Sequence, residues 1–508
     1  MEKRTLLAIV LSITVLILYQ VIFVGKPVPP PSERPPAPKE EPIKVIMPIE
    51  PTEGKPTPQL PESTVKVQTE LYTAVFTTRG GTLKSLQLRH YKDKDGLSIS
   101  LLKDIGVYPA LGIGSKNDFS ISKENFALIG NDLTLSGEKK TGSIVFEYAS
   151  PKYSIRRTYT FYSDSYRFDL KDELKGIPEY EITLGTDFGV SSKKDATAHI
   201  GPVLLTDSDR VELTVKKLKE PKTYKGKLRW IAQEDKYFFA SLVPLQGMNE
   251  AKAWEHQGSA AISLKGDSEL NSYIVYAGAK DHEKLKALGI GLEHIIDFGF
   301  FSIIARPLFW LLKFLNKFVG NYGWAIVLLT IIVRIPFIPI VNKGQKAMKK
   351  LQEIQPKMAE IREKYKKDPK RMQTELSELY KKYKVNPMGG CLPMLLQIPV
   401  FFALYKILSV AIELRGAPFM LWVTDLSLKD PYYIMPIVMG ATMVIQQKLT
   451  PSGGDPKQQK LMMFLPVIFT FLFLSFASGL VLYWLVNNVL SIVQQVYMNK
   501  KAKASGSG

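Results

Sequence analysis

The segment that decides the architecture of this chain is YGWAIVLLTIIVRIPFIPIV, residues 322–341. Its length and apolar composition are those of a membrane-spanning helix. Arg334 is the only ionisable residue in it. A guanidinium near the middle of a bilayer costs roughly 2.5–3.5 kcal/mol on insertion scales, so the fold must compensate for this charge.

A carboxylate on a neighbouring span usually compensates such a cation, and the sequence offers none at comparable depth. Asp, Glu, Lys and Arg are absent from the other apolar runs, which are residues 5–25, 389–405, 431–447 and 461–499. We therefore expect Arg334 to be an unpaired cation in a hydrated recess within the membrane. The alternative is a structural arginine that snorkels, or that caps carbonyls freed by Pro336 and Pro339.

The overall composition is that of a polytopic α-helical membrane protein that also carries a water-soluble domain. The chain has 508 residues, 33 prolines and a formal net charge of +19, with several long apolar runs. Cys391 is the only cysteine, which excludes an internal disulfide and, in its apolar setting, predicts a buried, inert thiol. We expect no cofactor, no metal site and no enzymatic activity, and no Walker motif is present to bind ATP.

The N-terminal region predicts a retained membrane anchor, residues 1–25, followed by an extended spacer. Two basic residues precede 20 uncharged residues, Thr5–Val24, which are long enough to span a hydrocarbon core of about 30 Å. A cleaved signal peptide is the alternative, but its apolar region would be shorter and followed by small residues at a cleavage site. Residues 26–62 are rich in proline, which predicts a semi-rigid linker.

Residues 63–285 predict one large all-β sandwich. Tyr72, Ala74 and Phe76 alternate toward one side, and the same period of two continues through residues 153–161 and 166–170. Turn residues between such runs are typical of an antiparallel sandwich. Its histidines have no metal-ligand spacing, and its carboxylates are expected on solvated faces. A sugar-binding, a partner-docking and a plain scaffold role all remain open.

Residues 293–318 predict an amphipathic helix that lies flat on the outer membrane surface. Arg306, Lys313 and Lys317 follow one another at spacings of seven and four, which places them on one helical face. Phe, Trp, Leu and Ile fill the remainder. A transmembrane span is the alternative, and three cations together with Pro307 disfavour it.

Five further spans are expected after the N-terminal anchor, which gives six transmembrane helices, at residues 322–342, 389–413, 431–448, 460–477 and 479–498. The loop at residues 343–387 has 14 Lys or Arg against 6 Asp or Glu, and such positively charged loops stay in the cytoplasm. Both termini, including the tail 499–508, are therefore expected in the cytoplasm. The sandwich then lies on the outer side of the membrane, in the periplasm of a double-membrane bacterium.

The loop 343–387 also predicts a basic helical hairpin. Apolar residues recur at spacings of three and four on both sides of Asp368-Pro369, as in two short helices that face each other. Pro356 lies inside the first helix, which must kink there or begin there. The basic surface suits lipid headgroups, ribosomal RNA or an acidic receptor, and a solvated charged hairpin is the alternative.

Four long blocks of sequence, in a fixed order, resemble a known family. They are VNPMGGCLPMLLQIPVFFALYKIL (385–408), ELRGAPFMLWVTDLSLKDPYYIMPIVMGATM (413–443), QQKLTP (446–451) and SGLVLYWLVNN (478–488). Residues 324–500 closely resemble the YidC type of membrane protein insertase, within the Oxa/Alb family. The layout of anchor, linker, periplasmic sandwich and interfacial helix also agrees. Ala477 departs from the proline that many relatives have there.

The resemblance implies a five-helix core, spans two to six, around a hydrophilic groove that is open to the cytoplasm and to lipid. Arg334 matches the arginine of that groove. Thr330, Gln447 and Trp484 match positions that line or brace it, and Tyr483 is a further candidate. A client would leave the groove for lipid along apolar surfaces of spans three and five. The candidate residues for these surfaces, here called greasy walls, are Phe401, Phe402, Phe464, Phe469 and Phe471. Ordinary packing or contact with lipid is the alternative role for these phenylalanines.

By this resemblance the protein inserts and helps to fold integral membrane proteins, and lipoproteins, in the bacterial inner membrane. Its expected partners are nascent membrane proteins, the lipid bilayer, the Sec translocon with its accessory subunits, and the ribosome or the signal-recognition-particle receptor at residues 343–387. A secondary transporter is the first alternative, but Lys406 and Glu413 near the outer end of 389–413 are expected to snorkel and provide no coupling pair. A membrane-anchored periplasmic receptor is the second, and it would need only one span.

Overall fold

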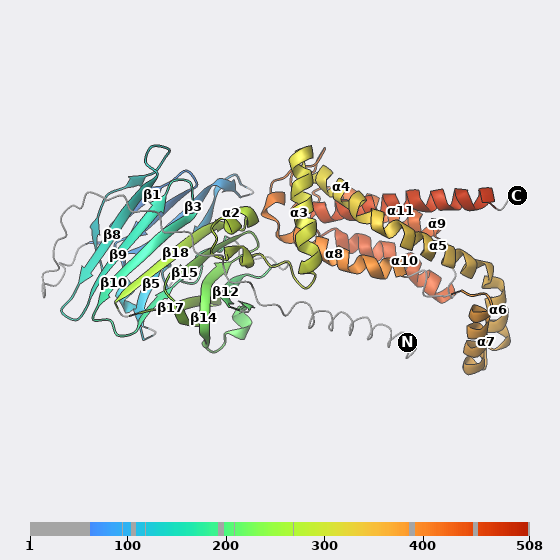
Figure 1. Cartoon of the computed structure of the whole chain (residues 1–508), viewed down its shortest axis with the longest axis horizontal. Coiled ribbons are helices and arrows are strands. Elements are labelled where there is room, and N and C mark those ends of the chain that lie inside the picture. The colour runs from blue at the N-terminus through green and yellow to red at the C-terminus, as the bar shows by residue number, and fades with distance from the viewer. Residues whose placement is uncertain are drawn as a thin grey trace. The chain divides into compact units, whose positions relative to one another are not determined.

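The computed structural model describes residues 61–505 apart from 94, 103–107, 117, 192–197, 208, 268, 386–391 and 451–455. The expected anchor 1–25, nearly all of the linker 26–62, and Cys391 lie outside the described residues. The chain divides into two compact units, Met1–Ile296 and Asp297–Gly508, each with its own architecture (Figure 1).

The first unit is built on two β-sheets (Figure 1). The smaller sheet has five strands in the order β4-β3-β2-β1-β7, and their bounds are β1 Thr64–Gln68, β2 Tyr72–Thr77, β3 Thr82–Lys92, β4 Ser98–Leu102 and β7 Leu133–Thr134. Neighbouring strands are antiparallel except β1 and β7, which are parallel.

The larger sheet has 13 strands, with β12 and β13 on a branch from β14, and its main path is β5-β11-β17-β16-β14-β15-β18-β10-β9-β8-β6. Its strands are β5 Gly112–Ser115, β6 Ala127–Ile129, β8 Thr141–Ala149, β9 Ser154–Tyr162, β10 Arg167–Lys175, β11 Tyr180–Thr183, β12 Gly201–Thr206, β13 Arg210–Glu212, β14 Lys222–Glu234, β15 Phe238–Pro244, β16 Met248–His256, β17 Ser259–Lys265 and β18 Leu270–Ala279. Short helices complete the unit, and they are η1 Ser120–Lys123, η2 Val215–Lys217, α2 His282–Ala287 and η3 Leu292–Ile295.

The two sheets face each other across an aromatic core. Tyr72, Ala74 and Phe76 on β2 are fully buried, as the predicted alternation requires. The ring of Phe76 lies 4.7–6.5 Å, centre to centre, from four rings of the larger sheet, which are Phe146, Tyr159, Phe161 and Phe168. The predicted period of two is confirmed, and the unit is a β-sandwich.

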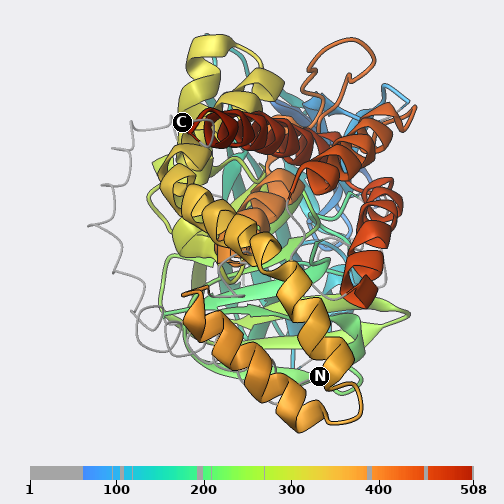
Figure 2. The same ribbon diagram turned by 90° about the vertical axis from the view of Figure 1, so that its right-hand side faces the viewer.

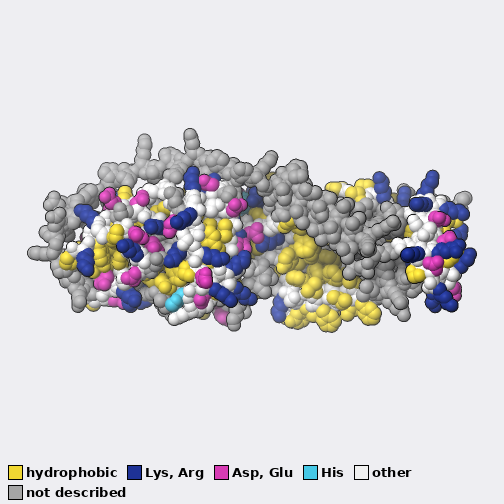
Figure 3. Space-filling view, turned by 90° about the horizontal axis from the view of Figure 1, so that it is seen from below, with side chains coloured by type: hydrophobic (Ala, Val, Ile, Leu, Met, Phe, Trp, Pro, Cys, Tyr) yellow, Lys and Arg dark blue, Asp and Glu magenta, His cyan; other side chains and the backbone are white. Residues whose placement is uncertain are grey.

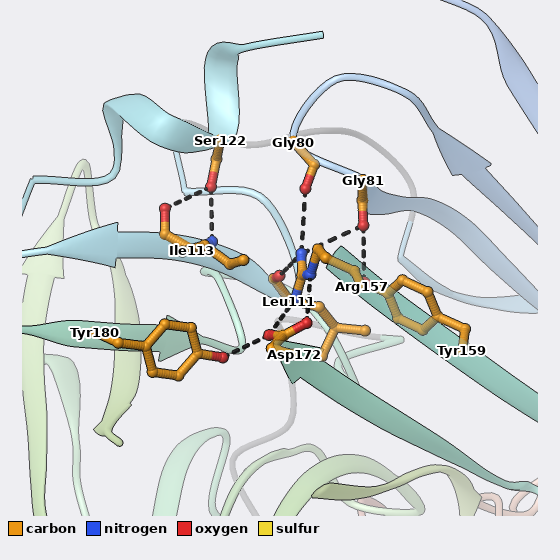
Figure 4. A network of polar contacts seen from close by, with 9 residues as sticks. All are labelled: Gly80, Gly81, Leu111, Ile113, Ser122, Arg157, Tyr159, Asp172 and Tyr180. Carbon is orange, nitrogen blue, oxygen red and sulfur yellow. Dashed lines mark hydrogen bonds and ion pairs between the residues drawn. The ribbon is translucent and has the colours of Figure 1, made fainter. Parts of the chain in front are cut away.

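A buried arginine, which forms an ion pair within the larger sheet, also contacts the smaller sheet beside this core (Figure 4). Arg157 on β9 donates from Nε to Asp172 Oδ1 on β10 at 2.9 Å and from Nη2 to Asp172 Oδ2 at 3.2 Å, and neither side chain is exposed. Its Nη1 donates to the carbonyls of Gly80 and Gly81, in the turn between β2 and β3, and to that of Leu111. One guanidinium therefore satisfies acceptors from both sheets.

The expectation that carboxylates of this domain lie on solvated faces is wrong for Asp172, Glu234 and Asp235, which are buried. Burial opposes the charge of Arg157, but the adjacent Asp172 raises the pKa of Arg157 above its ordinary value. Burial also raises the pKa of Tyr180 well above its ordinary value, so its hydroxyl stays protonated and donates to Asp172 Oδ2 at 2.6 Å. Alternation along β9 and β10 placed Arg157 and Asp172 in the interior, where each must have partners.

The second unit opens with α3 (Ser302–Val319), which was expected at residues 293–318. The helix begins later because the chain turns at Gly299, whose φ is 69° and whose N–H donates to the Asp297 carboxylate at 2.8 Å. Three aromatic residues along α3 are exposed, and these are Trp310, Phe314 and Phe318. The ring of Phe314 stacks on that of Trp310 and meets that of Phe318 edge to face.

A 3₁₀ turn interrupts the helical segment that carries Arg334. Helix α4 (Tyr322–Arg334) ends at the arginine, a 3₁₀ turn η4 (Ile335–Phe337) follows, and α5 (Ile338–Glu353) continues. Pro336 and Pro339 lie at this junction and account for it. Proline supplies no N–H to the helix, and its ring clashes with the preceding turn. The span predicted at 322–342 is therefore two helices, and α5 extends well into the predicted loop.

Helices α6 (Gln355–Lys364) and α7 (Pro369–Lys382) lie side by side beyond α5 (Figure 2). Of the two expectations for Pro356, the second is confirmed, since α6 starts at Gln355 with the proline in its first turn. A small apolar core holds α5, α6 and α7 together, with Leu351, Ile354, Met358 and Val385 buried and Met348, Leu376, Leu379, Tyr380 and Tyr383 packed against them.

Four longer helices complete the unit, namely α8 (Leu392–Val410), α9 (Ile434–Leu449), α10 (Pro456–Phe473) and α11 (Ser478–Ser505), with a 3₁₀ turn η6 (Ile412–Leu414) after α8. Among the described residues two stretches are long and apolar enough to cross a membrane, Tyr322–Glu353 and Ser478–Lys500, and three apolar helices are shorter. Figure 3 shows a broad hydrophobic surface on this unit and interspersed charges on the sheet unit. The count of six spans remains a prediction.

Candidate functional site

Arg334 is half-buried at the C-terminal end of α4, where α4 packs against α11. Its Nη1 donates to Asn487 Oδ1 at 2.6 Å and approaches the Asn487 carbonyl at 3.4 Å, and its Nη2 donates to Gln494 Oε1 at 3.1 Å. Both partners are neutral amides. Within the described ranges no carboxylate pairs with Arg334, and the guanidinium is hydrogen-bonded and not free.

The alternative role for Arg334, as a cap for carbonyls freed by the two prolines, is not what the structure shows. Among the described residues, the carbonyl that its side chain approaches belongs to Asn487 on another helix. The Ile338 carbonyl, at the start of α5, is instead approached by Gln494 Nε2 at 3.5 Å.

A polar stripe on α11, which the sequence analysis did not single out, faces Arg334. Asn487, Ser491 and Gln494 recur at spacings of four and three, which places them on one helical face. Ser491 Oγ donates to the Asn487 carbonyl at 2.8 Å, and Gln494 Nε2 donates to Asn342 Oδ1 on α5 at 2.8 Å. Counting only charged residues concealed this stripe, and uncharged amides at helical spacing in an apolar run were the available signal.

Thr330 and Tyr483 both lie near Arg334, and Gln447 belongs to a different helix. Thr330 is buried one turn before the arginine, and its hydroxyl donates to the Ile326 carbonyl of its own helix at 2.7 Å. Tyr483 on α11 is buried, and it lies close enough to Gln397 on α8 and to Arg334 to interact with both side chains. Gln447 is half-buried near the C-terminal end of α9.

Trp484 lies in an aromatic cluster that joins three helices. Its ring lies 5.0 Å from that of Phe401 on α8, 5.7 Å from Phe469 and 5.2 Å from Phe473 on α10. The indole Nε1 is buried and has no hydrogen-bond partner in the described part of the chain. Trp484 therefore packs against α8 and α10 from α11, and its described ring contacts are with phenylalanines and not with Arg334.

The phenylalanines proposed as greasy walls divide into two groups. Phe401 and Phe469 pack on Trp484, in line with the packing alternative. Phe402, Phe464 and Phe471 are exposed, in line with a surface that faces lipid or a client.

Lys406 and Glu413 do not snorkel freely, which corrects the prediction for them. Lys406 Nζ lies 2.8 Å from Asp297 Oδ2, and Lys313 Nζ on α3 lies 3.3 Å from Glu413 Oε1. These two ion pairs hold α3 and the residues just before it against the C-terminal end of α8.

The connection between α8 and α9 is a folded segment that is tied to α4 and α11. Asn321 Nδ2, at the start of α4, donates to the Phe419 carbonyl at 3.1 Å. Gly323 gives the Phe419 ring its space, because a Cβ there would lie 2.0 Å from the ring. Gly479 N–H, at the start of α11, donates to the Leu426 carbonyl at 2.9 Å. This end of the helical unit is thus closed by backbone and side-chain contacts.

Comparisons with known proteins match both units of the chain. The family described as 60Kd inner membrane protein matches residues 314–505, and the family described as YidC periplasmic domain matches residues 64–311. The membrane protein insertase YidC of Syntrophus aciditrophicus (strain SB) is 41% identical, with 99% of this chain and 100% of that protein covered. The one from Geobacter metallireducens is 42% identical, with 99% of each covered.

Among solved structures, a crystal structure of an active YidC insertase with its first transmembrane domain resolved aligns over 96% of this chain and 98% of that one. The sequence identity is 18% and the TM-score is 0.39.

A β-rich periplasmic domain followed by a bundle of apolar helices defines a class of inner membrane proteins. The chain belongs to the YidC family of membrane protein insertases, which confirms the resemblance found in its sequence. Its function is therefore insertion of proteins into the membrane, and the family is not known as an enzyme.

Proposed function

We propose that Arg334 is the charged centre of a hydrated, cytoplasm-open groove that draws the hydrophilic tail of a client partway across the bilayer. The observation that carries this proposal is that the guanidinium is held by the side chains of Asn487 and Gln494, which are neutral. A cation that has no anionic partner keeps its attraction for the carboxylates of a client. Water in the groove would shorten the apolar distance that the tail must cross.

Thr330 and Tyr483, beside the arginine, and Gln447, on α9, would line this groove, and Trp484 would brace it. The contacts that tie Phe419 and Leu426 to α4 and α11 would close it on the outer side. The client's apolar segment would then enter lipid along α8 and α10, where Phe402, Phe464 and Phe471 are exposed.

The remaining assignments follow from charge and from the family. Residues 343–387 would face the cytoplasm and receive clients from ribosomes or the signal-recognition pathway, because this segment has a net charge of +8 from 14 Lys or Arg and 6 Asp or Glu. The sheet unit would lie in the periplasm, both termini in the cytoplasm, and α3 at the outer membrane surface with its exposed aromatic residues toward lipid. The protein would work together with the Sec translocon on some of its clients.

The test is insertion of a small client into liposomes that contain the purified protein. Arg334→Ala is expected to reduce insertion of a client with an acidic outer segment by about tenfold or more, because the attraction for its carboxylates is lost. Arg334→Lys should retain most of the activity, since the charge matters more than the planar geometry. Equal loss in both variants would point to a structural role for the arginine and would refute the proposal.

A further inference from the structure

Two amides from α11 hold the guanidinium of Arg334 in a defined orientation. Asn487 Oδ1 accepts from Nη1 at 2.6 Å, and Gln494 Oε1 accepts from Nη2 at 3.1 Å. Gln494 is itself fixed, because its Nε2 donates to Asn342 Oδ1 at 2.8 Å. The Asn487 carbonyl also accepts from Ser491 at 2.8 Å, so the backbone on this side has a partner.

We propose that Asn487 and Gln494 are positioning residues that orient Arg334 for the carboxylates of a client while leaving its positive charge uncancelled. This inference rests on the proposed function of Arg334 and adds a requirement on the residues that hold it. The side chains that support the arginine must be acceptors, and they must also be neutral.

The chemistry of the two alternatives differs sharply. An amide oxygen carries a partial charge, and it can hold a guanidinium without neutralising it. A carboxylate at the same place would form an ion pair that is weakly screened because the site is partly buried. Arg334 would then resemble Arg157 of the first unit, whose charge is balanced by Asp172.

The bound orientation also leaves donors for an incoming group. The described residues accept from Nη1 and Nη2, and Nε of Arg334 has no acceptor among them. A guanidinium has five N–H groups, so Nε and a second N–H on Nη2 remain for a carboxylate, which binds arginine best through two parallel hydrogen bonds. The ligand class that this arrangement fits is therefore an acidic side chain on the client tail.

The decisive variant is Asn487→Asp, which keeps the size of the side chain and the acceptor at Oδ1 but adds a negative charge. No described residue accepts from Asn487 Nδ2, so the exchange removes no other hydrogen bond of this side chain within the described part of the chain. We expect the variant to fold and to unfold at a temperature no lower than that of the parent, because the added carboxylate gives the guanidinium an anionic partner. We also expect it to insert an acidic-tailed client about tenfold more slowly.

The matched control is Asn499→Asp on the same helix. Asn499 Oδ1 accepts from Gln495 Nε2 at 3.2 Å, so this exchange also retains an acceptor. Twelve residues separate it from Asn487, or about 18 Å along the helix at ~1.5 Å per residue, and among the described residues Asn499 is not a hydrogen-bond partner of Arg334. Insertion by the control should stay within about twofold of the parent.

The experiment measures insertion into liposomes for two clients that differ only in the tail, one with Asp residues and one with Asn at the same places. Asn487→Asp should slow the acidic client and leave the neutral client nearly unchanged, which a purely structural defect would not do. If it slows both clients equally, or neither, the proposed role of the amides is wrong. If Arg334→Ala fails to distinguish the two clients, the proposed function itself is wrong, so the two failures are separate.

Discussion

At the scale of single residues, two partly or fully buried arginines show opposite ways of placing a cation in an interior. Arg157 is fully buried against Asp172, and Arg334 is half-buried against amides. The first arrangement balances the charge and joins two sheets, whereas both side chains that hold the second arginine are neutral. The difference lies entirely in the partner, because both arginines occur in apolar patterns of sequence.

We expect Arg157→Ala to lower the free energy of unfolding of the sheet unit by about 3–5 kcal/mol, because Asp172 would remain buried without its cation. The neighbouring Arg156→Ala is the matched control. Arg156 lies on the opposite, exposed face of β9 and pairs with Glu147, so its loss should cost no more than about 1 kcal/mol. Denaturant unfolding of the full-length protein in detergent, followed by limited proteolysis, compares the two. Similar midpoints would show that the buried pair contributes little.

At the scale of elements, the hairpin α6–α7 is a small module whose apolar core is separate from the helical bundle. Its core is made by residues of the hairpin itself and of the end of α5, with Met358 at its centre. Such a module can be removed without exposing the packing of α4, α9 and α11. Its contribution is therefore expected to lie in receiving clients and not in holding the fold together.

Removing residues 350–384 should thus reduce insertion strongly and change the melting temperature of the membrane-embedded unit little. Thermal unfolding in detergent and insertion of a client in liposomes are measured on the same preparation. Met358→Asp is a useful companion variant, since it places a charge in the hairpin core while leaving the basic surface residues in the sequence. A large drop in melting temperature after the deletion would show that the hairpin is part of the bundle's own stability.

At the scale of the whole molecule, two compact units with separate cores suggest a division of labour. The first unit, Met1–Ile296, is a β-sandwich, and the second, Asp297–Gly508, contains Arg334 and every residue of the proposed site. The proposed mechanism uses none of the residues of the sandwich.

Deletion of most of the sandwich, residues 64–279, is expected to leave insertion of a simple client within a few-fold of the full-length protein. The assay is the same liposome insertion, with membrane residence and melting of the truncated protein as controls. Complete loss of activity in a stably folded, membrane-resident truncation would mean that the sandwich takes part in insertion.

Much of this architecture could be predicted from sequence periodicity. Period-two burial at Tyr72, Ala74 and Phe76 and the helical seam around Met358 followed from spacing alone, because one face of each element must be apolar. The sequence also shows Arg334 as a lone cation in an apolar run, and the cost of burying its charge predicted that the fold must compensate for it. Burial periodicity and the place of a charge in an apolar run depend on neighbouring residues, so they can be read from the sequence.

The partners of buried polar groups were decided only by tertiary structure. No spacing rule brings Asn487 and Gln494 to Arg334, more than 150 residues earlier, or pairs Lys406 with Asp297. Which side chain meets which depends on how helices cross and where prolines bend them, and these are long-range outcomes of packing. The sequence by itself therefore determined that a positive charge lies among apolar helices, and the tertiary structure decided that amides hold it and leave it charged.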